Sequence, residues 1–292
     1  MKPLFIGRLI IISVLVVALI AWLSISFIFW RNPSEILPTS TPEATNFVER
    51  NVIGQSVEGR EIEAYTFGQG DTHLIFVGGI HGGYEWNSVL LAYKFIDYLE
   101  ANPDFLPKNL TVTIIPSANP DGLFSVVGKE GRFKVEDVST NQQVLVSGRL
   151  NANEVDLNRN FDCKWQAESS WRGESVSGGA KVFSEPEAVA LRDFVLKHRI
   201  AGAIFWHSQA GAVYASECER GVLPKTLELM KAYAQASGYK AVESFDSYDV
   251  TGDAEGWLAS LDIPAITVEL KTHESLDWEQ NLAGVGAIWG LF

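Results

Sequence analysis

HLIFVGGIHGGYEW, residues 73–86, is the stretch that decides the fold. Its opening run, HLIFV, is rich in β-branched and aromatic residues and apolar on both faces, which is typical of a central strand covered on both sides. Two pairs of glycines flank His81 and permit a sharp turn with a close approach of the backbone. A longer amphipathic run then begins at Trp86. The stretch therefore predicts a strand, a tight turn that carries polar side chains, and a helix.

The same alternation of short apolar runs with longer amphipathic runs continues through residues 51–292. The pattern predicts strands over residues 61–67, 73–77, 110–116, 201–206, 213–215 and 265–270. It predicts helices over residues 86–101, 185–198, 224–237 and 278–290, with a capping box from Ser184 to Glu187 before the second of them. We therefore expect an α/β fold, a single domain with a mixed, mostly parallel central sheet flanked by helices.

Polar residues follow several of the predicted strands at the point where each strand ends. SANPDG begins at residue 117, HSQAG begins at His207, and Glu269 lies inside the apolar run AITVEL. In sheets of this kind, ligands bind beyond the carboxyl ends of the strands. The sequence thus places its candidate site at this edge of the sheet.

The N-terminal segment predicts a membrane anchor over residues 1–31. Residues 9–30 contain no charged residue, and as a helix these 22 residues would span about 33 Å, close to the hydrocarbon core of a bilayer. The run is longer than the apolar region of a cleaved signal peptide. Lys2 and Arg8 precede it, so the positive-inside rule predicts a single-pass protein of the cell membrane with its C-terminal domain extracytoplasmic. Residues 32–50 contain three prolines and predict a linker.

The charge excludes nucleic acid as an expected partner. The chain carries 23 basic and 36 acidic residues, a formal net charge of −13. Residues 1–31 contain three basic residues and no acidic one, so residues 32–292 carry −16. Binding to phosphate groups requires a basic face, which this composition does not favour.

His81, Glu85 and His207 are candidate zinc ligands. Two histidines, one carboxylate and an open position for water describe a catalytic zinc site. A histidine close to glycines is, however, often a hydrogen-bonding residue of a loop, so the pattern HGGYE does not by itself decide between the two interpretations.

Two further groups carry the same ambiguity. Glu269 in an apolar strand is either half of a buried ion pair or a general base that takes a proton from water at the metal. Asn158 and Arg159 either form a structural loop or bind a substrate carboxylate, for which the planar guanidinium of arginine is well suited.

Six motifs in order resemble the zinc carboxypeptidases related to carboxypeptidase A, over residues 51–292. GGIHGGYEW is similar to the first zinc-ligand motif, and NPDG to the loop after the next core strand. VDLNRNFD resembles the carboxylate-binding segment, and FSEPEA the segment that precedes a helix. FWHSQ and TVEL resemble the strands that carry the third ligand and the catalytic glutamate.

The resemblance implies a role for each matching residue. One zinc ion per chain would be bound by His81, Glu85 and His207, and Glu269 would be the base. Other implied roles are polarisation of the scissile carbonyl by Arg149, binding of the terminal carboxylate by Asn158 and Arg159, closure over the substrate by Tyr248, and selection of basic terminal residues by Glu255. The chain departs from the family in one respect, because its first motif has three residues between histidine and glutamate where the family has two.

The expected activity is hydrolysis of a C-terminal peptide bond, in a peptide or in a peptide of the cell wall. An aspartoacylase-like deacylase of N-acyl amino acids is a second interpretation, and a non-catalytic, membrane-tethered binding module of the same fold is a third. Cys163 follows the Arg159 segment and Cys218 follows the His207 strand, so in an extracytoplasmic domain we expect the two to form a disulfide.

Overall fold

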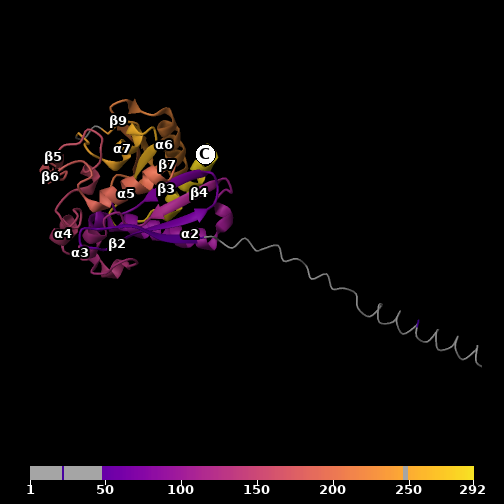
Figure 1. Ribbon diagram of the computed structural model, residues 1–292, viewed down its shortest axis with the longest axis horizontal. Coiled ribbons are helices and arrows are strands. Elements are labelled where there is room, and N and C mark those ends of the chain that lie inside the picture. The colour runs from indigo at the N-terminus through magenta and orange to yellow at the C-terminus, as the bar shows by residue number, and fades with distance from the viewer. Residues whose placement is uncertain (1–21, 23–47, 246–248) are drawn as a thin grey trace, which may run out of the picture. The chain divides into compact units, whose positions relative to one another are not determined.

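The computed structural model describes residues 22, 48–245 and 249–292 (Figure 1). The predicted anchor, apart from Trp22, lies outside the described residues, as do linker residues 32–47 and Tyr248. Within the described part of the chain, none of the helices has the length and apolar character needed to span a bilayer. The first strand begins at Val48, inside the segment that composition assigns to the linker.

The core of the domain is an eight-stranded mixed sheet with the strand order β1-β2-β4-β3-β7-β12-β8-β11. Four of its seven neighbouring pairs are parallel, namely β3–β4, β3–β7, β7–β12 and β8–β11, which confirms the predicted mixed, mostly parallel sheet. The strands are β1 (Val48–Gln55), β2 (Glu61–Gly68), β3 (Thr72–Val77), β4 (Leu110–Ile115), β7 (Ile200–Ser208), β8 (Ala212–Ala215), β11 (Lys240–Val242) and β12 (Ala265–Leu270).

Helices cover both faces of this sheet (Figure 1). They are α2 (Trp86–Ala101), α3 (Pro120–Val127), α4 (Gln142–Ser147), α5 (Pro186–Lys197), α6 (Pro224–Ser237), α7 (Ala254–Ser260) and α8 (Trp278–Ile288). Along β3 the side chains alternate, so that Leu74 and Phe76 pack in a cluster with α2, α6 and α8, whereas Ile75 and Val77 pack in a second cluster with α5 and α7. The two clusters explain why the central strands are apolar on both faces.

Two small pairs of strands complete the domain. β5 (Glu168–Trp171) and β6 (Glu174–Ser177) form an antiparallel hairpin, and β9 (Glu217–Cys218) pairs with β10 (Gly221–Val222). The predicted disulfide between Cys163 and Cys218 is confirmed, with the two Cα atoms 5.9 Å apart. It joins the segment after Arg159 to β9.

The capping box predicted at Ser184–Glu187 is wrong. The residue at the helix start is Glu185, and no side chain caps α5 there. The Ser184 hydroxyl donates to the Glu185 carboxylate, while the Glu187 carboxylate accepts from Asn151 Nδ2 and from the backbone N–H of Val57. Both carboxylates therefore form hydrogen bonds with neighbouring residues. These tertiary contacts take the place of the hydrogen bonds that a capping box would make with the helix backbone.

Candidate metal centre and substrate pocket

A single turn of 3₁₀ helix, Gly82–Glu85, places the first two candidate ligands side by side. The backbone N–H of Tyr84 donates to the carbonyl of His81, and Gly82 has φ +47°, a conformation that favours glycine. A Cβ at Gly82 would lie 2.5 Å from the carbonyl oxygen of Gly148. The three residues between His81 and Glu85 are thus contained in one tight turn. It brings Glu85 Oε1 to 2.8 Å from His81 Nδ1.

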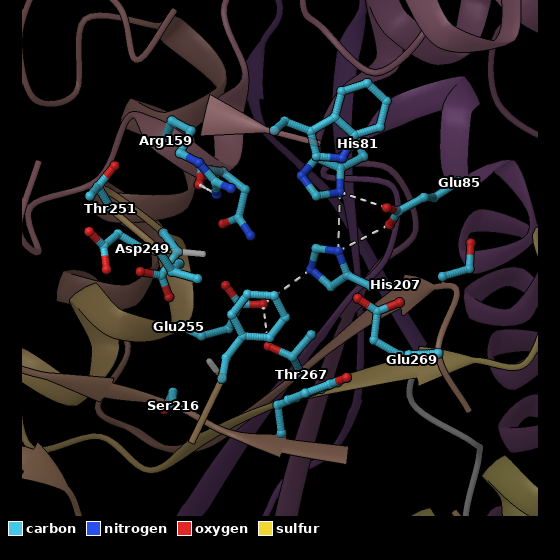
Figure 2. Close-up of a pocket in the computed structure, with 18 of the residues that line it drawn as sticks. His81, Glu85, Arg159, His207, Ser216, Asp249, Thr251, Glu255, Thr267 and Glu269 are labelled. Atoms are coloured by element: carbon cyan, nitrogen blue, oxygen red, sulfur yellow. Dashed lines mark hydrogen bonds and ion pairs between the residues drawn. The ribbon is translucent and has the colours of Figure 1, made fainter. Parts of the chain in front are cut away.

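His207 reaches the same point from β7 (Figure 2). Its Nδ1 lies 3.2 Å from His81 Nδ1 and 3.0 Å from Glu85 Oε2, and all three side chains are buried. Within the described residues these are the histidine, cysteine and acidic side chains grouped closely enough to hold a metal ion. Tetrahedral zinc with ligand distances of about 2.0–2.2 Å separates its ligand atoms by roughly 3.3–3.6 Å. The observed separations lie close to that range.

The far side of each histidine ring faces a carboxylate. His81 Nε2 lies 3.4 Å from Asp156 Oδ1, and His207 Nε2 lies 3.1 Å from Glu255 Oε1. A carboxylate at Nε2 favours the proton on that nitrogen and leaves the lone pair on Nδ1. Two lone pairs and the Glu85 carboxylate therefore converge on one point, and a cation is the group that suits such a set of donors.

The electrostatics also favour a positive charge at this point. Burial lowers the pKa of His207, but the Glu85 and Glu255 carboxylates outweigh it and hold this pKa well above its usual value. Burial opposes ionisation of Glu85, yet His81 and His207 lower the pKa of this carboxyl. Burial likewise opposes ionisation of Asp156, and Arg149 and His81 lower its pKa.

Glu269 lies beside the ligands because β12 and β7 are parallel neighbours with Glu269 paired to His207 (Figure 2). Its Oε2 is buried and has no hydrogen-bond partner among the described residues. Burial and the nearby Glu85 charge raise the pKa of Glu269 to about 8. A cation held by the neighbouring ligands would lower this pKa, because an opposite charge favours the ionised carboxylate.

Arg149 is buried next to the same group. Its Nε and Nη2 donate to Asp156 Oδ2 at 3.0 and 2.8 Å, and its Nη1 lies 3.8 Å from Glu85 Oε1. The guanidinium carbon is 4.5 Å from the centre of the Trp171 ring, which belongs to the β5–β6 hairpin. Arg149 is thus held at the edge of the ligand cluster by one carboxylate and one aromatic face.

Asn158 and Arg159 also line the pocket. Asn158 Oδ1 accepts a hydrogen bond from the backbone N–H of Ala254 at 2.8 Å, and Arg159 Nη1 donates to the carbonyl of Asn158 at 2.7 Å. Both side chains are buried among protein atoms and also border the cavity. The first contact fixes the start of α7 to this loop.

One cavity of about 680 Å³ brings the predicted site residues together. Those that line it are His81, Glu85, Arg149, Asn158, Arg159, His207, Glu255 and Glu269. The sequence interpretation gave no role to Trp171 or Thr267, which also line this cavity, or to Asp156 behind His81. Asp156 lies within the segment VDLNRNFD, which resembles a family motif. The polar hairpin around Trp171 contains no motif that would indicate a functional residue.

Glu255 has a different environment from a carboxylate that simply faces a substrate. Its Oε1 accepts from Thr267 Oγ1 at 2.9 Å and contacts His207 Nε2, while its Oε2 is buried without a hydrogen-bond partner among the described residues. The N-cap of α7 is Asp253, whose carboxylate accepts from the backbone N–H of Gly256. Glu255 therefore touches the metal centre as well as the pocket.

The sequence of the chain is similar to those of known proteins. The chain is 25% identical over 244 residues to γ-D-glutamyl-L-diamino acid endopeptidase 1 of Lysinibacillus sphaericus, covering 77% of this chain and 61% of that protein. It is 30% identical over 131 residues to murein peptide amidase A of Escherichia coli (strain K12), covering 41% of this chain and 50% of that protein. The chain thus spans between half and three fifths of the length of these two relatives.

Solved structures share the fold. Murein-tripeptide amidase from Escherichia coli O157 superposes with a TM-score of 0.58 at 23% identity, covering 82% of this chain and 91% of that one. Thrombin activatable fibrinolysis inhibitor superposes with a TM-score of 0.65 at 21% identity, covering 84% of this chain and 69% of that one. The family model for zinc carboxypeptidase matches residues 37–280. The chain therefore belongs to the zinc carboxypeptidase family, whose members use zinc, and its His81–Glu85–His207 cluster is a group that could bind that ion.

Proposed function

We propose that this protein is a zinc-dependent peptidase that hydrolyses an amide bond near the C-terminus of a peptide, with cell-wall peptides as its substrate class. The convergence of His81, Glu85 and His207 beside Glu269 in one cavity carries the proposal. When bound by these three ligands, a zinc ion would supply Lewis acidity, which lowers the pKa of water and polarises a carbonyl group.

The side chains around the ligand cluster have complementary tasks. Glu269 takes a proton from the attacking water and delivers it to the nitrogen of the leaving amine. Arg149 donates hydrogen bonds to the carbonyl oxygen as negative charge develops there. Arg159 and Asn158 bind the terminal carboxylate of the substrate and thereby orient the scissile bond. We assign to Tyr248, outside the described residues, the closure of the pocket over the substrate.

The names of two relatives support the choice of substrate class. One is a γ-D-glutamyl-L-diamino acid endopeptidase and the other a murein peptide amidase. The pocket of the present chain has an acidic wall formed by Asp249, Asp253 and Glu255. Burial and the neighbouring Glu255 raise the pKa of Asp253 to about 6, so this wall is a favourable place for a cation. A lysine side chain or the second amino group of a diamino acid would supply one.

The compartment is part of the proposal. A disulfide between Cys163 and Cys218 is suited to an oxidising environment, which agrees with an extracytoplasmic domain held at the cell membrane by residues 1–31.

Zinc content together with hydrolysis of a substrate panel tests the proposal. The panel contains matched peptides ending in Lys, Phe and Glu, a γ-D-glutamyl-diaminopimelate peptide, and N-acetylaspartate. We expect about one zinc per chain and the highest kcat/KM for the diaminopimelate or lysine peptide. Cleavage confined to N-acetylaspartate would favour the deacylase, and a zinc-loaded chain that cleaves none of the panel would favour a binding module.

A further inference from the structure

Glu255 contacts a candidate zinc ligand from a separate part of the chain. It lies in the first turn of α7, is 2% exposed, and places Oε1 3.1 Å from His207 Nε2 (Figure 2). His207 belongs to β7, 48 residues earlier in the chain. The contact therefore depends on how α7 is seated against the sheet.

Three interactions hold Glu255 in this place, one at its carboxylate and two at the start of its helix. Thr267 Oγ1 on β12 donates to the same Oε1 at 2.9 Å. The N–H of the preceding residue, Ala254, donates to Asn158 Oδ1, and the Asp253 carboxylate caps the helix start. A side chain whose carboxylate and backbone are both held in this way has little rotational freedom to lose when it orients its neighbour.

We propose that Glu255 is a positioning residue that holds the His207 ring in the orientation and tautomer required to bind zinc. By accepting a hydrogen bond from Nε2–H, it keeps the Nδ1 lone pair free and directed toward His81 and Glu85, where the ion would lie. The negative charge of Glu255 also increases the basicity of the imidazole as a ligand. Asp156, whose Oδ1 lies 3.4 Å from His81 Nε2, faces the other histidine from the corresponding side.

This role is distinct from the selection of a basic substrate residue. A pure selector changes the affinity for cationic substrates and leaves the metal untouched, whereas a positioning residue changes zinc affinity in the absence of any substrate. The inference rests on the proposed function only in requiring that the three ligands bind zinc. The positioning role can therefore fail while the chain is still a peptidase, and it can hold even if the chain cleaves no peptide.

The test measures the zinc dissociation constant of the full chain by competition with a fluorescent chelator. We expect Glu255→Ala to raise the zinc Kd about 10–100-fold, the usual effect of losing such a partner, and Glu255→Gln to raise it less because the amide oxygen still accepts from Nε2. Cobalt substitution gives a second readout, since a displaced His207 alters the visible absorption of the bound ion.

Glu217→Gln is the matched control. It removes one negative charge from the wall of the same cavity, but the Glu217 carboxylate lies 3.8 Å from Lys164, and its strand β9 does not carry a ligand. We expect its zinc Kd to remain within about twofold of the parent value.

Two results would overturn the inference. One is a parental zinc Kd and cobalt spectrum in Glu255→Gln and Glu255→Ala together with a raised KM for lysine peptides, because Glu255 would then be a selector alone. The other is an equal loss of zinc affinity in Glu217→Gln, because general charge would then account for the effect. If Glu255→Ala fails to fold by circular dichroism, Glu255→Leu decides, because leucine fills similar space but cannot accept a hydrogen bond from Nε2, and a parental zinc Kd in that variant refutes the proposal.

Discussion

Replacing Cys163 and Cys218 together by alanine should destabilise the domain by about 4 kcal/mol. The disulfide closes a loop over 55 residues. In the chain-entropy model, a cross-link over a loop of this length removes about 14 cal/mol/K from the unfolded state, or about 4 kcal/mol at 25 °C. This is a large share of the 5–15 kcal/mol by which a typical domain is stable.

Urea unfolding of the parent and the double variant, followed by tryptophan fluorescence, measures the loss. Because the cross-link acts mainly on the unfolded chain, its removal should also increase the m-value, since a less constrained unfolded state exposes more surface. The zinc Kd serves as a control, because neither cysteine contacts the candidate ligands and the native site should be unchanged.

A loss below about 1 kcal/mol with an unchanged m-value would refute this reasoning, because the unfolded chain would then gain no freedom from removal of the cross-link. A loss of about 4 kcal/mol accompanied by a weakened zinc site would also contradict it. The bond would then act by holding the Arg159 segment and β9 in place in the native state.

Three further outcomes are expected. Glu269→Gln should lower kcat by about 10²–10⁴-fold while zinc stays bound, as measured by turnover and metal analysis, and full activity would exclude Glu269 as the base. Arg159→Lys should raise KM about 10–100-fold for peptides with a free terminal carboxylate, because lysine lacks the planar fork of donors, and an equal effect on an amidated peptide would contradict this. Burial and the charge of His198 lower the pKa of His73 to about 4. The unfolded chain therefore binds more protons at this site between pH 6.5 and 4, so the free energy of unfolding should fall as the pH drops through this range, and His73→Gln should reduce the slope.

The central strands and long helices could be predicted because burial on both faces leaves a strong local pattern. The predicted ranges for α2 and α6 agree with the structure at both ends, and β12 also begins and ends as expected. β1 and the β5–β6 hairpin were not predicted, because β1 is mostly exposed and the hairpin sequences ESSW and ESVS are predominantly polar. Strands of this kind are specified by pairing with neighbouring strands rather than by an alternation of apolar and polar residues in their own sequence.

The grouping of the candidate residues in one cavity could be predicted, but the contacts among them could not. His81, Glu85, His207 and Glu269 each follow or occupy a buried strand, and such a position is visible in a sequence. The contact of Glu255 with His207 depends on how α7 packs against the sheet and on the conformation of one side chain. No local sequence pattern encodes either of these. The sequence therefore suggested a substrate-facing role for Glu255 and gave no indication of its contact with a histidine.

The segment from Asp156 to Arg159 links the candidate metal centre to the residue proposed to bind the substrate carboxylate. Asp156 Oδ1 faces His81, and its Oδ2 accepts both hydrogen bonds from Arg149. Two residues later, Asn158 Oδ1 holds the N–H of Ala254, the residue next to Glu255, which in turn contacts His207. One short turn thus supports both histidines, one directly and one through α7. Because the next residue, Arg159, is the proposed carboxylate anchor, the distance from a bound terminus to the metal would be set within this one short segment. An exopeptidase needs that distance to be fixed, since it decides which bond of the substrate is cut.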